Sequence, residues 1–255
     1  MTLFDSHAHL DHAKFEGERD AILASLADAG VGFVMNVGCD LSSSLRSVAL
    51  AKKYPFVYAS VGTHPDAADK FSPADLAMYR ALAADGRVRA VGEIGLDYHY
   101  PDGPTRLDQM RCFTAQLELA RELKKPVIVH EREAHGDAMD ILRQFPDVTG
   151  VFHCFSGSPE FALELIKRGW YIGFTGVVTF RNARRAVETA AAIPLDRMLI
   201  ETDCPYMAPE PYRGKRCDSR MIIETAKKLA EIRGISLDEL ANATTENAKR
   251  LFGIA

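Results

Sequence analysis

The sequence predicts a (β/α)8 barrel, or TIM barrel, formed by a single domain over residues 1–255. Eight short apolar runs alternate with stretches of helical periodicity, and the runs are continuously apolar, as in parallel strands buried on both faces. Each strand–helix unit averages about 32 residues, a normal size for a βα repeat. Acidic and histidine side chains follow five of the runs. A barrel brings those strand ends to one mouth, whereas an open doubly wound sheet spreads them apart.

The first half of the chain supplies four of these units. Leu3 and Phe4 lead into the first strand end, and further strands are expected over residues 31–37, 56–61 and 88–91, with helices over 20–29, 42–53 and 72–84. Gly30 ends the first helix, because glycine readily adopts the left-handed conformation that follows a helix. Ser72 and Pro73 start the third, since a capping serine followed by proline fits a first helical turn.

The second half repeats the alternation without a linker, a low-complexity tract or a charge block. The sequence predicts strands over residues 126–129, 150–152, 170–174 and 198–200, and helices over 105–123, 133–145, 158–169, 184–192, 219–233 and 236–251. This unbroken pattern is why we expect one domain and not two.

Composition limits the classes of function. The formal net charge of −4 gives no overall positive field, so nucleic-acid binding would depend on a local patch or on bound metal. The five scattered cysteines form no CxxC pair, which argues against a disulfide framework or a zinc knuckle. The sequence shows neither a leader pattern nor an apolar run long enough to span a bilayer. We therefore expect a cytoplasmic protein, and we expect it to be a monomer.

Six side chains at the predicted strand ends form a candidate metal site. His7 and His9 are two residues apart, so an extended strand aims both imidazoles at one point. Each candidate alone has a structural explanation, such as a strand cap. Together they are hard to explain without a cation, because buried imidazoles and carboxylates are costly unless paired or coordinated. Six ligands suit two divalent ions, of zinc, magnesium or manganese, better than one. The candidates are His7, His9, Glu93, His130, His153 and Asp203.

Several of these residues lie in motifs that resemble those of the TatD family of metal-dependent deoxyribonucleases. The motifs are Asp5-Ser6-His7-Ala8-His9-Leu10-Asp11, Gly92-Glu93-Ile94-Gly95-Leu96-Asp97-Tyr98, Val127-Ile128-Val129-His130, His153-Cys154-Phe155-Ser156-Gly157, Glu201-Thr202-Asp203-Cys204-Pro205-Tyr206 and Met207-Ala208-Pro209-Glu210-Pro211-Tyr212-Arg213-Gly214-Lys215. The resemblance continues to Phe252 and implies a metal-dependent hydrolase barrel that cleaves phosphodiester bonds in DNA, with 3′-to-5′ polarity. It implies that His7, His9, Glu93 and Asp203 hold one ion, and that Glu93, His130 and His153 hold the second.

Further roles follow from side-chain chemistry. Asp203 and Glu93 are the expected catalytic residues, Asp203 as general base and Glu93 as a carboxylate that bridges two ions. Arg213, Arg132 and His64 are candidate contacts to single-stranded or frayed DNA, since guanidinium groups pair well with phosphate. Lys215 and Arg216 are as easily explained as solvated charges. Glu201 is expected to orient a ligand histidine, Cys154 and Cys204 to pack as thiols, and His12, His99 and His135 to lie on loops or helix surfaces.

Two segments depart from the family pattern. Arg216-Cys217-Asp218-Ser219 stands where the family commonly has Asn-Glu or Asn-Gln and then proline, and Glu131 stands where it usually has serine or threonine. We expect both to face the substrate. Two other functions also fit the metal ligands: an amide, ester or lactone hydrolase of the amidohydrolase type, and a metal-binding protein without activity. Related hydrolases often carry a modified lysine where Glu93 stands, which favours the phosphodiesterase.

Overall fold

Eight parallel strands form one sheet whose spatial order follows the chain, from β1 to β8, with helices between successive strands. This is the (β/α)8 barrel class that the sequence predicts. The computed structural model describes all 255 residues, which divide into two compact units, residues 1–36 with 153–255 and residues 37–152. The expectation of a single domain stays a prediction. None of the helices combines the length and apolar character that crossing a bilayer requires.

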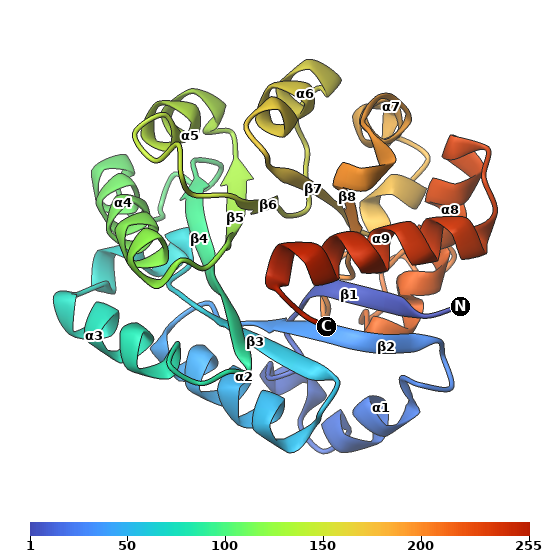
Figure 1. The fold of residues 1–255 in the computed structure, drawn as a ribbon, viewed down its shortest axis with the longest axis horizontal. Coiled ribbons are helices and arrows are strands. Elements are labelled where there is room, and N and C mark those ends of the chain that lie inside the picture. Colours follow the sequence, from blue (N-terminus) through green and yellow to red (C-terminus); the bar gives the residue numbers. More distant parts are fainter. The chain divides into compact units, whose positions relative to one another are not determined.

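The first unit contains strands β1, β7 and β8 and all of β2 except its last residue, Val37. Its elements are β1 (Leu3–Ala8), α1 (Arg19–Ser25), β2 (Val31–Val37), α6 (Pro159–Lys167), β7 (Tyr171–Phe174), α7 (Arg184–Ala192), β8 (Met198–Ile200), α8 (Ile222–Arg233) and α9 (Leu237–Phe252). Helix α9 lies along β1 (Figure 1), and the rings of Phe4 and Phe252 are 6.0 Å apart. The chain just beyond β8 pairs with the end of β1 through the parallel bridge between Cys204 and Ala8.

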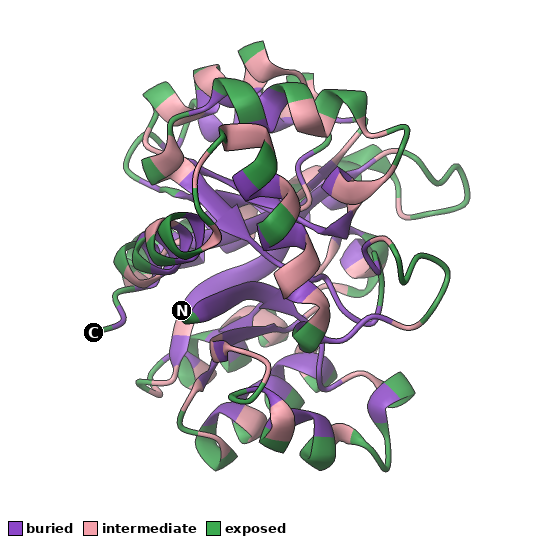
Figure 2. Ribbon diagram, turned by 90° about the vertical axis from the view of Figure 1, so that its right-hand side faces the viewer, coloured by how far each residue is buried: buried purple, intermediate pink, exposed green.

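The second unit contains strands β3 to β6. Its elements are α2 (Leu41–Lys53), β3 (Val57–Val61), α3 (Pro73–Leu82), β4 (Val88–Asp97), α4 (Arg106–Leu123), β5 (Val127–Arg132), α5 (His135–Leu142) and β6 (Gly150–Phe152). Neighbouring strands pair in parallel, β3 with β4, β4 with β5 and β5 with β6. The strands are buried, while exposed residues gather on the helices and loops (Figure 2).

Polar side chains place the helix starts close to their predicted positions. Asp40 accepts a hydrogen bond from the backbone N–H of Ser43 at 2.6 Å and starts α2. Asp75 accepts one from the backbone N–H of Ser72 at 2.8 Å at the start of α3. Thr105 caps α4 in the same way. Each cap satisfies a backbone group that has no partner within its helix, so local sequence is enough to mark these boundaries.

The largest difference from the predicted boundaries is in β4. The sequence predicts that this strand ends at Val91, but it continues to Asp97, with a shift of register between Val91 and Ile94. Glu93 therefore lies inside the strand and not after it. The extension requires Gly95, because a Cβ atom there would be 1.9 Å from the carbonyl oxygen of His130 on β5. Only glycine lets the two strands approach this closely.

Candidate metal centre

Three predicted ligands converge in the first unit. His7 Nε2 lies 3.0 Å from His9 Nε2, and Asp203 Oδ1 lies 3.7 Å from His7 Nε2 and 3.4 Å from His9 Nε2. The backbone holds the two segments side by side: the N–H of Asp203 donates to the carbonyl of His7, and the N–H of His9 donates to that of Cys204, both at 2.8 Å. Residues almost 200 positions apart in the chain thus form one rigid group.

These distances fit a divalent cation. Ligand atoms about 2.0–2.2 Å from one metal ion are about 3.0–3.5 Å from each other in tetrahedral or octahedral geometry, as the His7, His9 and Asp203 atoms nearly are. Burial by itself raises the pKa of Asp203, but the hydrogen bond to His9 and the positive charges of His7 and His153 outweigh burial and hold its pKa below the usual value. Asp203 is therefore a carboxylate at neutral pH, which is the form that binds metal.

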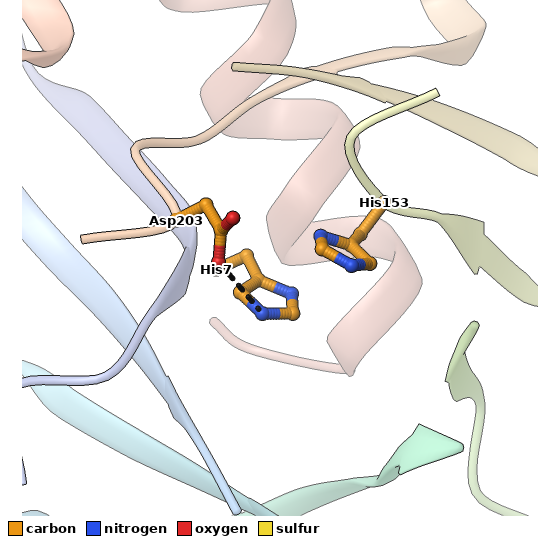
Figure 3. A group of neighbouring side chains, drawn as sticks. All are labelled: His7, His153 and Asp203. Atoms are coloured by element: carbon orange, nitrogen blue, oxygen red, sulfur yellow. Dashed lines mark ion pairs between the residues drawn. The ribbon is translucent and has the colours of Figure 1, made fainter. Parts of the chain in front are cut away.

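His153 completes the first group. Its ring stacks on that of His7, with centroids 3.9 Å apart and planes 16° from parallel. Figure 3 shows the two imidazoles beside the Asp203 carboxylate, and one ligand atom from each residue lies within 4.8 Å of the others. The resemblance implied that His153 serves with Glu93 and His130. In the first unit it lies against His7 and Asp203, and we call these three residues and His9 the His7 cluster.

Two buried carboxylates support the His7 cluster. Glu201 Oε1 lies 3.5 Å from His153 Nδ1 and accepts a hydrogen bond from Cys154 N, so it is placed to orient that imidazole, as the sequence suggests. Its space depends on Gly173, where a Cβ atom would be 2.6 Å from the carboxylate. Asp5, which the sequence analysis left without a role, accepts hydrogen bonds from the N–H and hydroxyl of Thr202 at 2.9 and 2.7 Å. Asp5 therefore fixes the segment that carries Asp203.

Two thiols lie beside this cluster, that of Cys204 buried and that of Cys154 half-buried. Burial raises the pKa of Cys154 and of Cys204 to about 12. Both side chains are neutral thiols at neutral pH, and thiolate is the form that binds metal. They pack beside Thr175 and Ser219, respectively.

A second group of ligand atoms lies in the second unit, and we call it the Glu93 cluster. Glu93 Oε1 is 3.1 Å from His130 Nδ1 and 3.6 Å from His64 Nε2. The sequence predicts His64 as a substrate contact, whereas the structure places it with two predicted metal ligands. Cys39 approaches the other oxygen of Glu93, with Sγ 3.6 Å from Oε2.

Asp97 is the residue of this cluster that sequence analysis missed. Its Oδ2 is 3.0 Å from His130 Nε2, so it orients the imidazole whose Nδ1 faces Glu93. The side-chain amide of Gln109 on α4 in turn holds both the N–H and the carbonyl of Asp97, each at 2.8 Å. The signal in the sequence was the position of Asp97 four residues after Glu93, beyond the predicted end of the strand.

We expect Asp97→Asn to weaken metal binding at the Glu93 cluster by about 10- to 100-fold, because carboxylates that orient ligand imidazoles typically contribute this much. The measurement is metal retained after dialysis against chelators of graded strength. Asp102→Asn, at an exposed position in the loop before α4, is the matched control. Unchanged retention by Asp97→Asn would mean that this hydrogen bond does not position His130 for metal.

The predicted phosphate contacts lie on loops and strand ends. Arg213 is exposed, and its guanidinium stacks 4.2 Å from the ring centroid of Phe180. Arg132, at the end of β5, lies 5.4 Å from the ring centroid of Tyr100 and donates to its hydroxyl at 3.3 Å. Neither arginine forms an ion pair with a carboxylate, so both charges are available to an anionic ligand.

The two departures from the family pattern are held by contacts within the protein, whereas the sequence analysis expected both to face the substrate. Arg216 pairs with Glu18 at 2.7 Å and donates to the carbonyl of Lys14, while the rest of its segment, residues 217–219, is buried. Glu131 is also buried. It accepts a hydrogen bond from Ala134 N at 2.7 Å and contacts His135, so it caps α5. Alternation along β5 places Glu131 on the face opposite His130 and Arg132.

We therefore expect Glu131→Ser to lower stability and not activity. Loss of the cap should reduce the free energy of unfolding by about 1–2 kcal/mol, seen as a fall of several degrees in Tm. The neighbouring Arg132→Gln is the matched comparison, because it should lower activity with little change in Tm. A large loss of kcat/KM in Glu131→Ser at unchanged Tm would place Glu131 at the substrate after all.

Comparisons with known proteins all point to one family. The sequence model of the TatD related DNase family matches residues 4–253. The chain is 40% identical over 254 residues to the uncharacterized metal-dependent hydrolase YabD of Bacillus subtilis, covering 99% of each chain. It is 35% identical to the 3′-5′ ssDNA/RNA exonuclease TatD of Cronobacter sakazakii, covering 98% of this chain and 97% of that one. The crystal structure of YJJV, a TatD homolog from Escherichia coli K12, superposes with a TM-score of 0.93 at 32% identity, covering 99% of this chain and 98% of the other.

Proposed function

The chain belongs to the TatD family of metal-dependent hydrolases, and from this premise we propose that it cleaves phosphodiester bonds in DNA, as a 3′-to-5′ exonuclease on single strands and frayed ends. The observation that carries the proposal is the convergence of His7 Nε2, His9 Nε2 and Asp203 Oδ1 within 3.7 Å of one another. The name of the Cronobacter sakazakii relative supports the choice of substrate and polarity. A cytoplasmic location and a monomeric state stay predictions from the sequence.

The proposal includes two divalent ions, of zinc, manganese or magnesium. The His7 cluster of the first unit would hold one ion, and the Glu93 cluster of the second unit, which contains His130 and His64, would hold the other. Ions bound there supply Lewis-acid activation of a water and neutralise the charge of the phosphate.

Side chains of the protein transfer the proton, orient the ligand histidines and bind the phosphate. The carboxylate of Asp203 takes a proton from the attacking water, since its lowered pKa keeps it ionised. One of its oxygens faces His7 and the other is turned away from it (Figure 3). Asp97 accepts an N–H bond from His130, and Glu201 Oε1 lies 3.5 Å from His153 Nδ1, so each carboxylate faces one ring nitrogen and leaves the other as the ligand atom. Arg132 and Arg213 pair with phosphate oxygens of the strand.

The test is a time course of cleavage with metal-stripped protein to which Mg²⁺, Mn²⁺ or Zn²⁺ is added. A single strand labelled at its 3′ end should release labelled mononucleotide in the first turnover, while the same strand labelled at its 5′ end should shorten stepwise. The rate of cleavage of an RNA strand of the same sequence measures the preference for deoxyribose over ribose. Turnover of esters, amides or lactones without any cleavage of DNA would instead assign the centre to the amidohydrolase type.

A further inference from the structure

Two short turns start at residues of the His7 cluster, one running from His9 to His12 and the other from Asp203 to Tyr206. The side chains at their far ends are in contact. The N–H of His12 donates to the carbonyl of His9 at 3.0 Å, and the N–H of Tyr206 donates to the carbonyl of Asp203 at 2.9 Å. Each turn thus begins at a metal ligand and ends three residues later at a ring. The two rings meet edge to face, with centroids 5.9 Å apart and an angle of 78° between their planes. The metal ligands therefore have an aromatic pair directly beside them.

The Tyr206 ring is held in place although it is exposed. Its side chain is 44% exposed, yet its hydroxyl lies 3.4 Å from His12 Nε2. His12 Nδ1 accepts the N–H of Lys14 at 3.0 Å, so in the neutral ring Nε2 carries the hydrogen and donates to that hydroxyl. An aromatic ring that is fixed with its face toward solvent leaves apolar surface in contact with water. Such a ring is also the usual surface on which a nucleobase stacks.

Positive charge lies on the same surface. The ammonium of Lys14 is 4.9 Å from the centroid of the Tyr206 ring. Its backbone carbonyl accepts a hydrogen bond from Arg216 at 2.6 Å, and Arg216 pairs in turn with Glu18. The segment that departs from the family pattern therefore anchors Lys14. An exposed ammonium on an anchored backbone beside an aromatic ring suits a ligand with a planar base and a phosphate.

We propose that Tyr206, His12 and Lys14 form a nucleobase platform, on which the base next to the scissile phosphate stacks against Tyr206 while Lys14 moves to the phosphate. This inference rests on the proposed phosphodiesterase function and makes its substrate class specific: a nucleotide whose base is unstacked. A base inside a duplex is already stacked on both faces, so the platform selects single strands and frayed ends.

The test compares two phosphodiesters that release p-nitrophenol, thymidine 5′-(p-nitrophenyl) phosphate, which has a base, and methyl p-nitrophenyl phosphate, which has none. The ratio of their kcat/KM values measures recognition of the base. Tyr206→Leu is expected to lower this ratio about 5- to 150-fold, the range that one base–aromatic stack contributes. Tyr206→Phe keeps the ring and should keep most of the ratio. Tyr212→Leu, at a tyrosine of similar exposure (37%) on the same loop, is the matched control and should not change it.

A second readout separates this proposal from the proposed function. A single strand with 2-aminopurine as its 3′-terminal base should lose fluorescence on mixing with metal-loaded protein, before any cleavage, and Tyr206→Leu should abolish this quenching. Cleavage without quenching, or an equal ratio in the Tyr206→Leu and Tyr212→Leu proteins, would overturn the platform and leave the phosphodiesterase standing. Quenching that depends on Tyr206 without cleavage of any phosphodiester would support the platform and overturn the proposed reaction.

Discussion

Asp203→Asn is expected to lower phosphodiester hydrolysis by about 10³-fold or more, because the amide cannot accept the proton that a general base takes and is a weaker metal ligand. The fold should survive. Asp203 adopts a left-handed conformation, with φ of 55°, which asparagine tolerates better than most residues. The amide also keeps an oxygen toward His7 and His9. The measurement is kcat/KM for a labelled single strand at saturating metal.

Metal analysis separates the two contributions of Asp203. If the Asp203→Asn protein keeps the metal content of the unmodified protein, the loss of rate belongs to proton transfer. If it loses an ion, the carboxylate acts mainly as a ligand. Asp196→Asn, at an exposed position in the same unit, controls for the change of charge. Activity within tenfold of the unmodified protein would exclude Asp203 from both roles.

Glu93→Gln is expected to remove about one equivalent of metal and to reduce activity about 10²- to 10³-fold. The carboxylate oxygens of Glu93 are the atoms that His130, His64 and Cys39 face, at 3.1, 3.6 and 3.6 Å. The amide has nearly the same volume but no negative charge. A cation bound beside His130 and His64 would therefore lose its anionic ligand. The measurements are metal content by mass spectrometry and the rate of DNA cleavage.

Glu131→Gln is the control for Glu93→Gln, because Glu131 is a buried glutamate on the adjacent strand whose carboxylate caps a helix. It should keep its metal and its rate at a temperature well below its Tm. Retention of two equivalents of metal by Glu93→Gln, with normal activity, would contradict the assignment of Glu93 as a metal ligand.

The sequence by itself determined the fold class and predicted most of the side chains that the structure brings together in the two clusters. Apolar runs and helical periodicity are local properties, so strands such as Val31–Val37 and Gly150–Phe152 have the bounds that their own residues predict. The two-residue spacing of His7 and His9 is also local, because a strand presents alternate residues on one face. Their convergence at 3.0 Å follows from that spacing.

Tertiary structure alone decided which residues orient the candidate ligands and which lie beside them. Asp97 reaches His130 only because β4 continues past Glu93, and that extension depends on pairing with β5 and on the close approach that Gly95 permits. Glu131 looks like a substrate residue in the sequence, but its strand turns it toward the start of α5. Tyr206 and His12 meet across 194 positions of the chain. Contacts of this kind have no local signature, because they depend on how strands and loops pack against one another and not on the pattern within any one of them.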